Sequence, residues 1–293
     1  MSMRALFRGL TAAAAAAGAV ALGLGLTGPP AQAATPLPYV ALGDSYSAGS
    51  GILPLDPTAS LLCARSTADY PHVIADRIGA RLTDVTCGGA ETKDFASAQY
   101  PGVAPQLDAL GDSTGLVTLT IGGNDSDTFI DAILACGSAG VVTAGQGAPC
   151  RALYGDSFDH TIDSTTYPAV RTALQQVRAK APGARVAVLG YPWILPATAA
   201  PGCFAKMPIA AGDVPYLRDL QTHLNAAVRR AAADTGATFV DLAAASEGHD
   251  ACAPASTRWI EPVLFGTNFV PVHPNATGER QMAERTLSVL GED

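Results

Sequence analysis

The stretch Pro38-Tyr39-Val40-Ala41-Leu42-Gly43-Asp44-Ser45 is a short apolar run that ends in a turn. A run without charges, bounded by proline and glycine, is typical of a strand that is buried on both faces. Such strands belong to parallel sheets, whose two faces are covered by helices. Because Ser45 follows the run directly, we expect it at the carboxyl end of a strand, where ligands meet an open α/β sheet.

Further β-like runs and helical segments alternate along the rest of the chain. The other predicted strands are 82–86, 116–121, 184–189 and 237–242, and the predicted helices are 69–79, 125–135, 167–180, 214–234 and 276–290. This alternation predicts an α/β fold with an open parallel sheet covered on both sides. The stretches 49–68, 137–166, 191–213 and 243–273 are rich in glycine, proline, serine and cysteine, so we expect them to be long loops that build a binding site.

The first 33 residues have the features of a secretory signal peptide. Arg4 and Arg8 precede a long Ala, Gly, Val and Leu run, and Ala31-Gln32-Ala33 is a small-x-small cleavage site. A membrane anchor is the alternative, but the cleavage site favours removal. We therefore expect a signal peptide at 1–33 and one secreted domain at 34–293, without stable insertion into a membrane.

The charge and cysteine content narrow the function further. The net charge is −8 and only 15% of the residues are charged, which argues against a nucleic-acid surface and favours a small uncharged or mixed substrate. All six cysteines lie beyond the predicted cleavage site, and an even number in an exported chain predicts disulfides. They are Cys63, Cys87, Cys136, Cys150, Cys203 and Cys252. We find no metal-ligand spacing or phosphate-binding glycine motif, and therefore expect no metal and no cofactor.

Gly-Asp-Ser occurs three times, and only the context separates the copies. Gly111-Asp112-Ser113-Thr114-Gly115 matches the Gly-x-Ser-x-Gly elbow of hydrolases, but that elbow needs a strand before its serine, and here the strand follows. Ser157 has no strand before it. Ser45 is therefore the candidate nucleophile.

Other blocks fall at equivalent strand ends. Cys87-Gly88-Gly89-Ala90 follows the second predicted strand, and Gly122-Gly123-Asn124-Asp125 follows the third. Glycines let a backbone approach a ligand, and an asparagine amide can donate to a developing oxyanion. Val272-His273-Pro274-Asn275 lies directly before the last predicted helix.

These blocks, in this order, resemble the GDSL family of serine hydrolases, also called SGNH hydrolases after their Ser, Gly, Asn and His. The cysteine-bearing loops are similar to those of its secreted actinobacterial lipases, esterases and phospholipases. The resemblance implies a three-layer α/β/α fold with a five-stranded parallel sheet. It also implies disulfides between consecutive cysteines: Cys63–Cys87, Cys136–Cys150 and Cys203–Cys252.

The resemblance also implies the catalytic roles. Ser45 would attack an ester carbonyl while His273 accepts its proton, because a serine hydroxyl is a weak nucleophile without a base. The backbone N–H groups of Ser45 and Gly89 and the side chain of Asn124 would form the oxyanion hole. An unperturbed histidine would give the reaction an acid limb at a pKa of about 6.5.

One position departs from the family pattern. Most members carry an aspartate three residues before the histidine, and here that residue is Val270. We therefore predict a Ser45–His273 dyad whose imidazole is oriented by the Val270 backbone carbonyl. The alternative is that Asp250 or Glu261 reaches the ring from the preceding loop.

The substrate is less well defined by the sequence. Apolar residues of the late loops are candidates for an acyl-chain groove: Tyr191, Trp193, Ile194, Leu195, Trp259, Phe265 and Phe269. They favour a monomeric lipase or esterase that acts on small-molecule or lipid esters with apolar acyl chains. Phospholipids are among these esters. A carbohydrate acetylesterase and a non-catalytic extracellular binding module are the alternatives.

Overall fold

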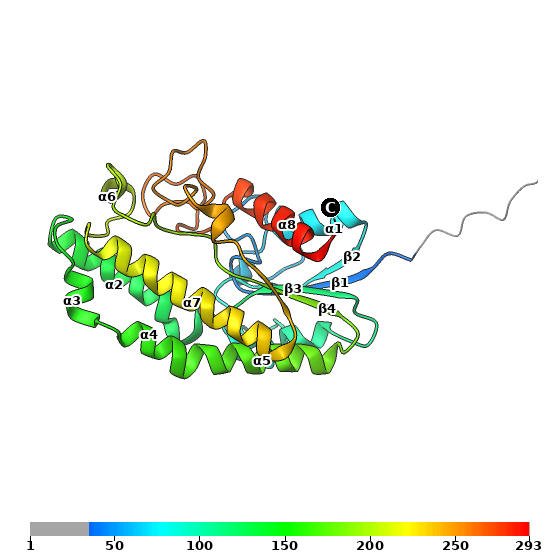
Figure 1. The fold of residues 1–293 in the computed structure, drawn as a ribbon. Coiled ribbons are helices and arrows are strands. Elements are labelled where there is room, and N and C mark those ends of the chain that lie inside the picture. Colours follow the sequence, from blue (N-terminus) through cyan, green and yellow to red (C-terminus); the bar gives the residue numbers. More distant parts are fainter. Residues whose placement is uncertain (1–34, 293) are drawn as a thin grey trace, which may run out of the picture. The chain divides into compact units, whose positions relative to one another are not determined.

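The protein is described by a computed structural model for residues 35–292, and its centre is a five-stranded parallel sheet (Figure 1). The strands are β1 (Pro38–Gly43), β2 (Arg81–Asp84), β3 (Leu116–Thr120), β4 (Arg185–Leu189) and β5 (Thr238–Val240). Their order is β2-β1-β3-β4-β5, and every neighbouring pair is parallel. The chain runs outward from β1 in both directions, so β1 lies at the switch point where open α/β sheets bind ligands.

Alternating side chains of the strands face two helical layers. Helices α1 (Tyr70–Ile78) and α8 (Ala276–Leu290) cover one face, and α5 (Tyr167–Lys180) and α7 (Asp213–Thr235) cover the other (Figure 1). On β1, Tyr39 belongs to the core on the α1 and α8 side, whereas Val40 packs in the core with α5 and α7. The predicted α/β architecture, with helices on both sides of a parallel sheet, is confirmed.

Local signals explain where the helices near the sheet edge begin. Asp69 accepts a hydrogen bond from the His72 N–H at the start of α1. Asn275 accepts from the N–H groups of Thr277 and Gly278 at the start of α8. Such caps satisfy donors that have no partner inside the helix. The cap of α8 therefore fixes the backbone two residues after His273.

The stretch 137–166 is mostly helical, and the prediction of a long loop there was wrong. It contains the end of α2 (Thr128–Val142), α3 (Pro149–Tyr154), α4 (Ser157–Thr161) and the π-helix η5 (Ile162–Thr166). Tertiary packing outweighs the weak helix propensity of its glycines and threonines, and a disulfide ties α2 to α3. The short elements are α6 (Cys203–Lys206), η1 (Leu61–Cys63), η2 (Thr92–Phe95), η3 (Gln106–Ala109), η4 (Asp125–Asp127) and η6 (Ala244–Ser246).

Three disulfides cross-link segments that lie outside the strands. They join Cys63 to Cys87, Cys136 to Cys150 and Cys203 to Cys252, which are the pairs that the resemblance implies. Within residues 35–292, no helix has the length and apolar character needed to cross a membrane. The predicted signal peptide, 1–33, lies outside the described residues.

Candidate active site

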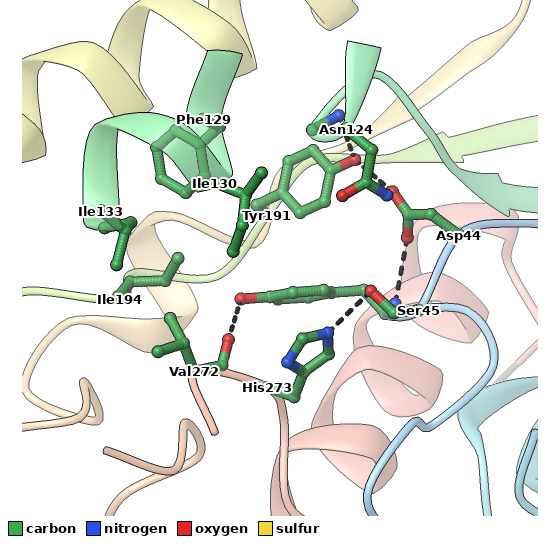
Figure 2. A pocket seen from close by; sticks show the side chains of 12 residues that line it. Asp44, Ser45, Asn124, Phe129, Ile130, Ile133, Tyr191, Ile194, Val272 and His273 are labelled. Atoms are coloured by element: carbon green, nitrogen blue, oxygen red, sulfur yellow. Dashed lines mark hydrogen bonds between the residues drawn. The ribbon is translucent and has the colours of Figure 1, made fainter. Parts of the chain in front are cut away.

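The side chains of Ser45 and His273 meet at the carboxyl end of β1 (Figure 2). The Ser45 Oγ lies 2.7 Å from the His273 Nε2, which is hydrogen-bond distance. Ser45 follows β1 and His273 precedes α8, so the two residues are 228 positions apart and only the fold brings them together. The hydroxyl is placed to give its proton to the imidazole.

Asp44 holds the turn that carries Ser45. Its buried carboxylate accepts hydrogen bonds from the Tyr46 N–H, the Thr120 hydroxyl and, at 2.5 Å, the Tyr191 hydroxyl. Burial raises the pKa of Asp44 to about 6, although these donors oppose the shift. The carboxylate bonds to neither the Ser45 nor the His273 side chain, so its contribution is the shape of the turn.

The carbonyl that orients the His273 ring is that of Pro271, and the prediction of Val270 was wrong. The His273 Nδ1 lies 2.7 Å from the Pro271 oxygen. Val272 has a φ of 62°, in the left-handed region, and this tight turn directs the carbonyl two residues before the histidine toward the ring. The Tyr46 hydroxyl donates to the Val272 carbonyl at 2.7 Å and holds the turn. With Nδ1–H bonded to Pro271, Nε2 is left as the proton acceptor.

Burial lowers the pKa of His273, and the hydrogen bond to the Pro271 carbonyl only partly opposes this shift. Only a neutral imidazole can accept a proton from serine, so the lowered pKa would let His273 act as a base at a lower pH than an exposed histidine. The expected acid limb therefore moves below the ordinary value of about 6.5.

Neither alternative carboxylate contacts the imidazole. Glu261 pairs with Arg258, with the Oε2 2.6 Å from the Nη2, and also accepts from the Asn275 side chain. Asp250 accepts from the Cys252 N–H. Glu261 still matters to the site, because its backbone N–H donates to the His273 carbonyl at 2.9 Å.

The expected oxyanion donors, Ser45, Gly89 and Asn124, belong to the three separate loops that follow β1, β2 and β3. Asn124 lines the same cleft as Ser45 and His273, and its Nδ2 donates to the Ala90 carbonyl at 3.0 Å. An amide nitrogen carries two hydrogens, so this bond leaves the second available. Because the bond fastens Asn124 to the segment that contains Gly89, the two expected donors are held as one unit.

An apolar wall faces the polar groups across the cleft (Figure 2). Among the residues predicted for the acyl groove, Tyr191 and Ile194 do line the cleft. The others do not: Trp193, Leu195 and Trp259 are buried elsewhere, while Phe265 and Phe269 are exposed. Arg218 lies over the Trp193 ring, 3.5 Å from its centre, and His249 stacks on Trp259.

Helix α2 contributes a part of the wall that was not predicted from the sequence. Phe129, Ile130 and Ile133 line the cleft from the start of this helix. Their spacing places them along one side of the first turns. The sequence indicated only where this helix begins, because it comes soon after the Gly-Gly-Asn-Asp block and must therefore start beside the site.

One group among residues 35–292 has side-chain atoms close enough together to share a metal ion. It consists of Asp69, His72 and Asp84, whose candidate ligand atoms lie within 4.8 Å of one another. The His72 Nδ1 already bonds to the Asp69 Oδ1 at 2.7 Å, and Arg65 pairs with Asp84. None of these residues lines the cleft of Ser45.

Comparisons with known proteins cover nearly the whole described chain. The model of the GDSL-like lipase/acylhydrolase family matches residues 41–281. Lipase 2 of Streptomyces coelicolor is 70% identical over 264 residues, which are 90% of this chain and 89% of that protein. Among solved structures, phospholipase A1 from Streptomyces albidoflavus NA297 has a TM-score of 0.70 and 33% identity, covering 88% of this chain and 99% of that one. The extracellular lipase of Streptomyces rimosus has a TM-score of 0.69 and 30% identity, covering 87% and 98%.

Proposed function

The chain belongs to the GDSL-like lipase/acylhydrolase family and is a carboxylic ester hydrolase, and we propose that Ser45 is its nucleophile and His273 its general base. The distance of 2.7 Å between the Ser45 Oγ and the His273 Nε2 is the observation that carries this proposal. The second support is the Pro271 carbonyl, which fixes the tautomer that leaves Nε2 free to accept a proton.

The proposed reaction has two acyl-transfer steps. The Ser45 Oγ attacks the ester carbonyl carbon as His273 takes the hydroxyl proton, which gives a tetrahedral intermediate. When this collapses, the C–O bond to the alcohol breaks and His273 returns the proton to the departing oxygen. Water then attacks the acyl-enzyme with the same base, and the acid and free Ser45 are released.

We propose that three donors stabilise the oxyanion: the N–H groups of Ser45 and Gly89 and the side-chain amide of Asn124. Each donor of this type is typically worth about 10²–10³ in rate. The hydrogen bond from Asn124 to the Ala90 carbonyl supports this proposal, because it holds Asn124 against the segment that contains Gly89.

The apolar wall supports a lipid-type ester as substrate. Phe129, Ile130, Ile133 and Ile194 present hydrocarbon surface beside the catalytic groups. Burying an acyl chain against such a surface is favourable by about 0.8 kcal/mol for each CH₂. We propose that fatty acyl esters, including those of phospholipids, bind with their acyl chain along this wall.

A sugar acetate would use the same catalytic residues but leave the wall uncovered. A carbohydrate acetylesterase therefore remains the alternative function, and hydrolysis of acetylxylan in preference to p-nitrophenyl caprylate would favour it.

We further propose that residues 1–33 direct export and that residues 34–293 act as a secreted monomer. The three disulfides support an oxidising compartment.

Covalent labelling tests the proposed nucleophile. A fluorophosphonate should label the intact protein at Ser45 and should not label Ser45→Ala, which should also lose p-nitrophenyl ester hydrolysis. Retained activity in Ser45→Ala would show that another residue is the nucleophile. A p-nitrophenyl chain-length series, run beside a phospholipid, then defines the substrate class.

A further inference from the structure

The two backbone donors proposed for the oxyanion hole are held in different ways. The trans peptide group is planar, so its carbonyl and the following N–H point in opposite directions, and fixing one fixes the other. For Ser45, the relevant carbonyl is that of Asp44, which accepts a hydrogen bond from the Ala48 N–H at 2.9 Å. This donor is therefore oriented by the backbone of its own turn.

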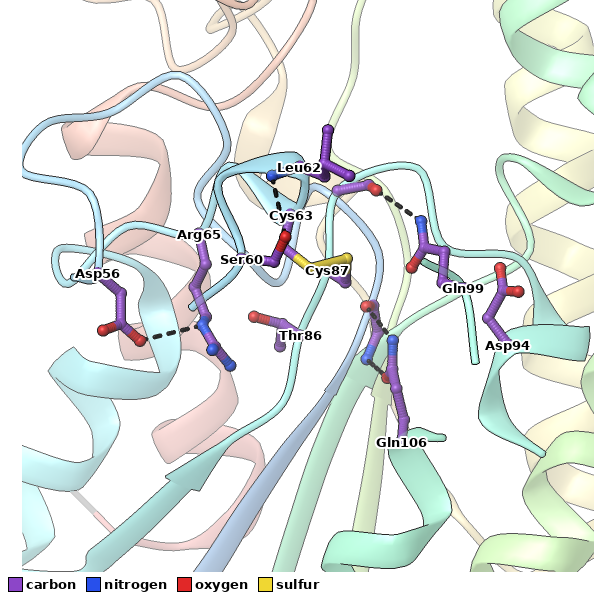
Figure 3. Close-up of a disulfide and its surroundings, with 12 residues drawn as sticks. Asp56, Ser60, Leu62, Cys63, Arg65, Thr86, Cys87, Asp94, Gln99 and Gln106 are labelled. Carbon is purple, nitrogen blue, oxygen red and sulfur yellow. Dashed lines mark hydrogen bonds and ion pairs between the residues drawn. A yellow bond between two sulfur atoms is a disulfide. The ribbon is translucent and has the colours of Figure 1, made fainter. Parts of the chain in front are cut away.

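The Gly89 donor is oriented by a side chain from another loop. The Gly88 carbonyl accepts a hydrogen bond from the Gln99 Nε2 at 2.8 Å (Figure 3). Gln99 comes from the loop between η2 and η3. Gly89 has a φ of 74°, in a region that glycine enters without strain, so its own backbone preference does not select this orientation.

The neighbouring groups of this segment are fixed by other contacts. The Gly88 N–H donates to the Cys63 carbonyl at 2.8 Å, and the disulfide joins Cys63 to Cys87. The Ala90 carbonyl accepts from Asn124. Among the hydrogen bonds within the described chain, none uses the Gly89 N–H. That donor is left for a ligand, and Gln99 holds the opposite side of its peptide group.

The amide of Gln99 has a defined orientation. Its Oε1 is buried without a hydrogen-bond partner, and exchanging Oε1 and Nε2 would place two acceptors against each other at the Gly88 carbonyl. A buried amide oxygen without a partner is unfavourable, so the donated bond must compensate for it. Gln106, in contrast, bonds to both the N–H and the carbonyl of Gly43 and satisfies both ends of its amide (Figure 3).

We propose that Gln99 is a positioning residue for catalysis, which aligns the Gly89 N–H with the developing oxyanion through its hydrogen bond to the Gly88 carbonyl. This inference rests on the proposed function. Gln99 acts through the peptide group and not on the substrate, so its loss should affect the transition state more than substrate binding.

Two variants of the full secreted protein test this role. Gln99→Met keeps the approximate length of the side chain and removes the donor, and Gln99→Glu keeps its shape but offers only acceptors. We expect kcat to fall about tenfold or more, and by less than the 10²–10³ of a lost donor, with KM changed by less than about twofold. The matched controls are Gln175→Met and Gln175→Glu on the exposed side of α5, which should retain the parent kcat.

A transition-state analogue separates alignment from a structural role. An alkylboronic acid forms a tetrahedral adduct with the catalytic serine, so its affinity should fall by the same factor as kcat/KM in the Gln99 variants. The end-point fraction labelled by a fluorophosphonate and the Tm should stay close to the parent values. The inference is overturned if kcat is unchanged, or if the loss of kcat equals a loss of labelled protein. Failure of the parent protein to label at Ser45 would overturn the proposed function instead.

Discussion

His273 and His72 are both hydrogen-bonded through Nδ1, but their surroundings have opposite effects on the ring. His273 faces the carbonyl of Pro271, and burial lowers its pKa. His72 lies 2.7 Å from the carboxylate of Asp69, and this bond raises its pKa. One imidazole is thus kept neutral and able to accept a proton, while the other is stabilised in its charged form.

The contrast shows that local spacing does not identify the base. An aspartate three residues before a histidine is the arrangement that the family resemblance leads one to expect, and Asp69 and His72 have it. His273 has Val270 at that position. The Ser45 hydroxyl nevertheless lies beside His273, because the loop before α8 ends at the same sheet edge as β1. We therefore expect the position relative to the proposed nucleophile, and not this spacing, to determine which histidine acts as the base.

Replacing the two histidines gives the largest expected difference. His273→Ala removes the base and should lower kcat by about 10⁴-fold or more. His72→Ala should leave kcat within about twofold, because His72 lies outside the cleft. Steady-state hydrolysis of p-nitrophenyl butyrate measures both. A loss in His72→Ala comparable with that in His273→Ala would contradict the assignment.

The pH profile tests the protonation state of His273. The base must be neutral, so kcat/KM should fall about tenfold per pH unit on the acid side and reach a plateau above. Because burial lowers the pKa of His273, the limb should lie below the ordinary histidine value of about 6.5. An acid limb with a pKa above that value would mean that a carboxylate stabilises the charged form of the His273 ring.

The sequence was sufficient for the parts of the site that follow strand ends. The apolar run before Ser45 and the Gly-Gly-Asn-Asp block before α2 indicate the carboxyl edge of a parallel sheet directly. The orienting carbonyl was not predictable, because it depends on the left-handed conformation of Val272, a residue that rarely adopts it. The contribution of Phe129 required knowing which side of α2 faces the cleft, and tertiary packing determines that.

Glu261→Gln tests whether a carboxylate serves His273 after all. The Glu261 side chain pairs with buried Arg258, and losing that charge should lower the free energy of unfolding by about 3 kcal/mol. The kcat of folded protein should fall less than tenfold, because the carboxylate does not contact the ring. Urea unfolding and active-site-titrated rates separate the two effects. Asp250→Asn is the second check, and a loss in either variant on the scale of His273→Ala would rule out the dyad.

The acidic residues around His72 should affect how the free energy of unfolding depends on pH, and should not affect catalysis. Burial, with the nearby Asp69 carboxylate, raises the pKa of Asp84 to about 8, whereas its unfolded value is about 3.9. The folded protein therefore binds more protons between these values, and its stability falls as pH rises toward 8. Asp84→Asn should flatten this dependence, because asparagine does not titrate. Urea unfolding at pH 5 and pH 8 measures the change in unfolding free energy between the two pH values. Exposed Asp76→Asn is the control with the same change in charge. If Asp84→Asn leaves the dependence of the unfolding free energy on pH unchanged, the raised pKa of Asp84 is contradicted.

The smallest expected effect concerns the apolar wall, where the two neighbouring side chains Ile130 and Leu134 of α2 can be compared. Ile130 lines the cleft and Leu134 does not, although both are accessible to solvent. Truncating Ile130 to alanine removes hydrocarbon contact with a long acyl chain but not with a short one. At about 0.8 kcal/mol for each CH₂ that loses contact, the ratio of kcat/KM for p-nitrophenyl octanoate to that for the acetate should fall about fourfold. Leu134→Ala should leave the ratio unchanged, and an equal change in both variants would place the acyl chain elsewhere.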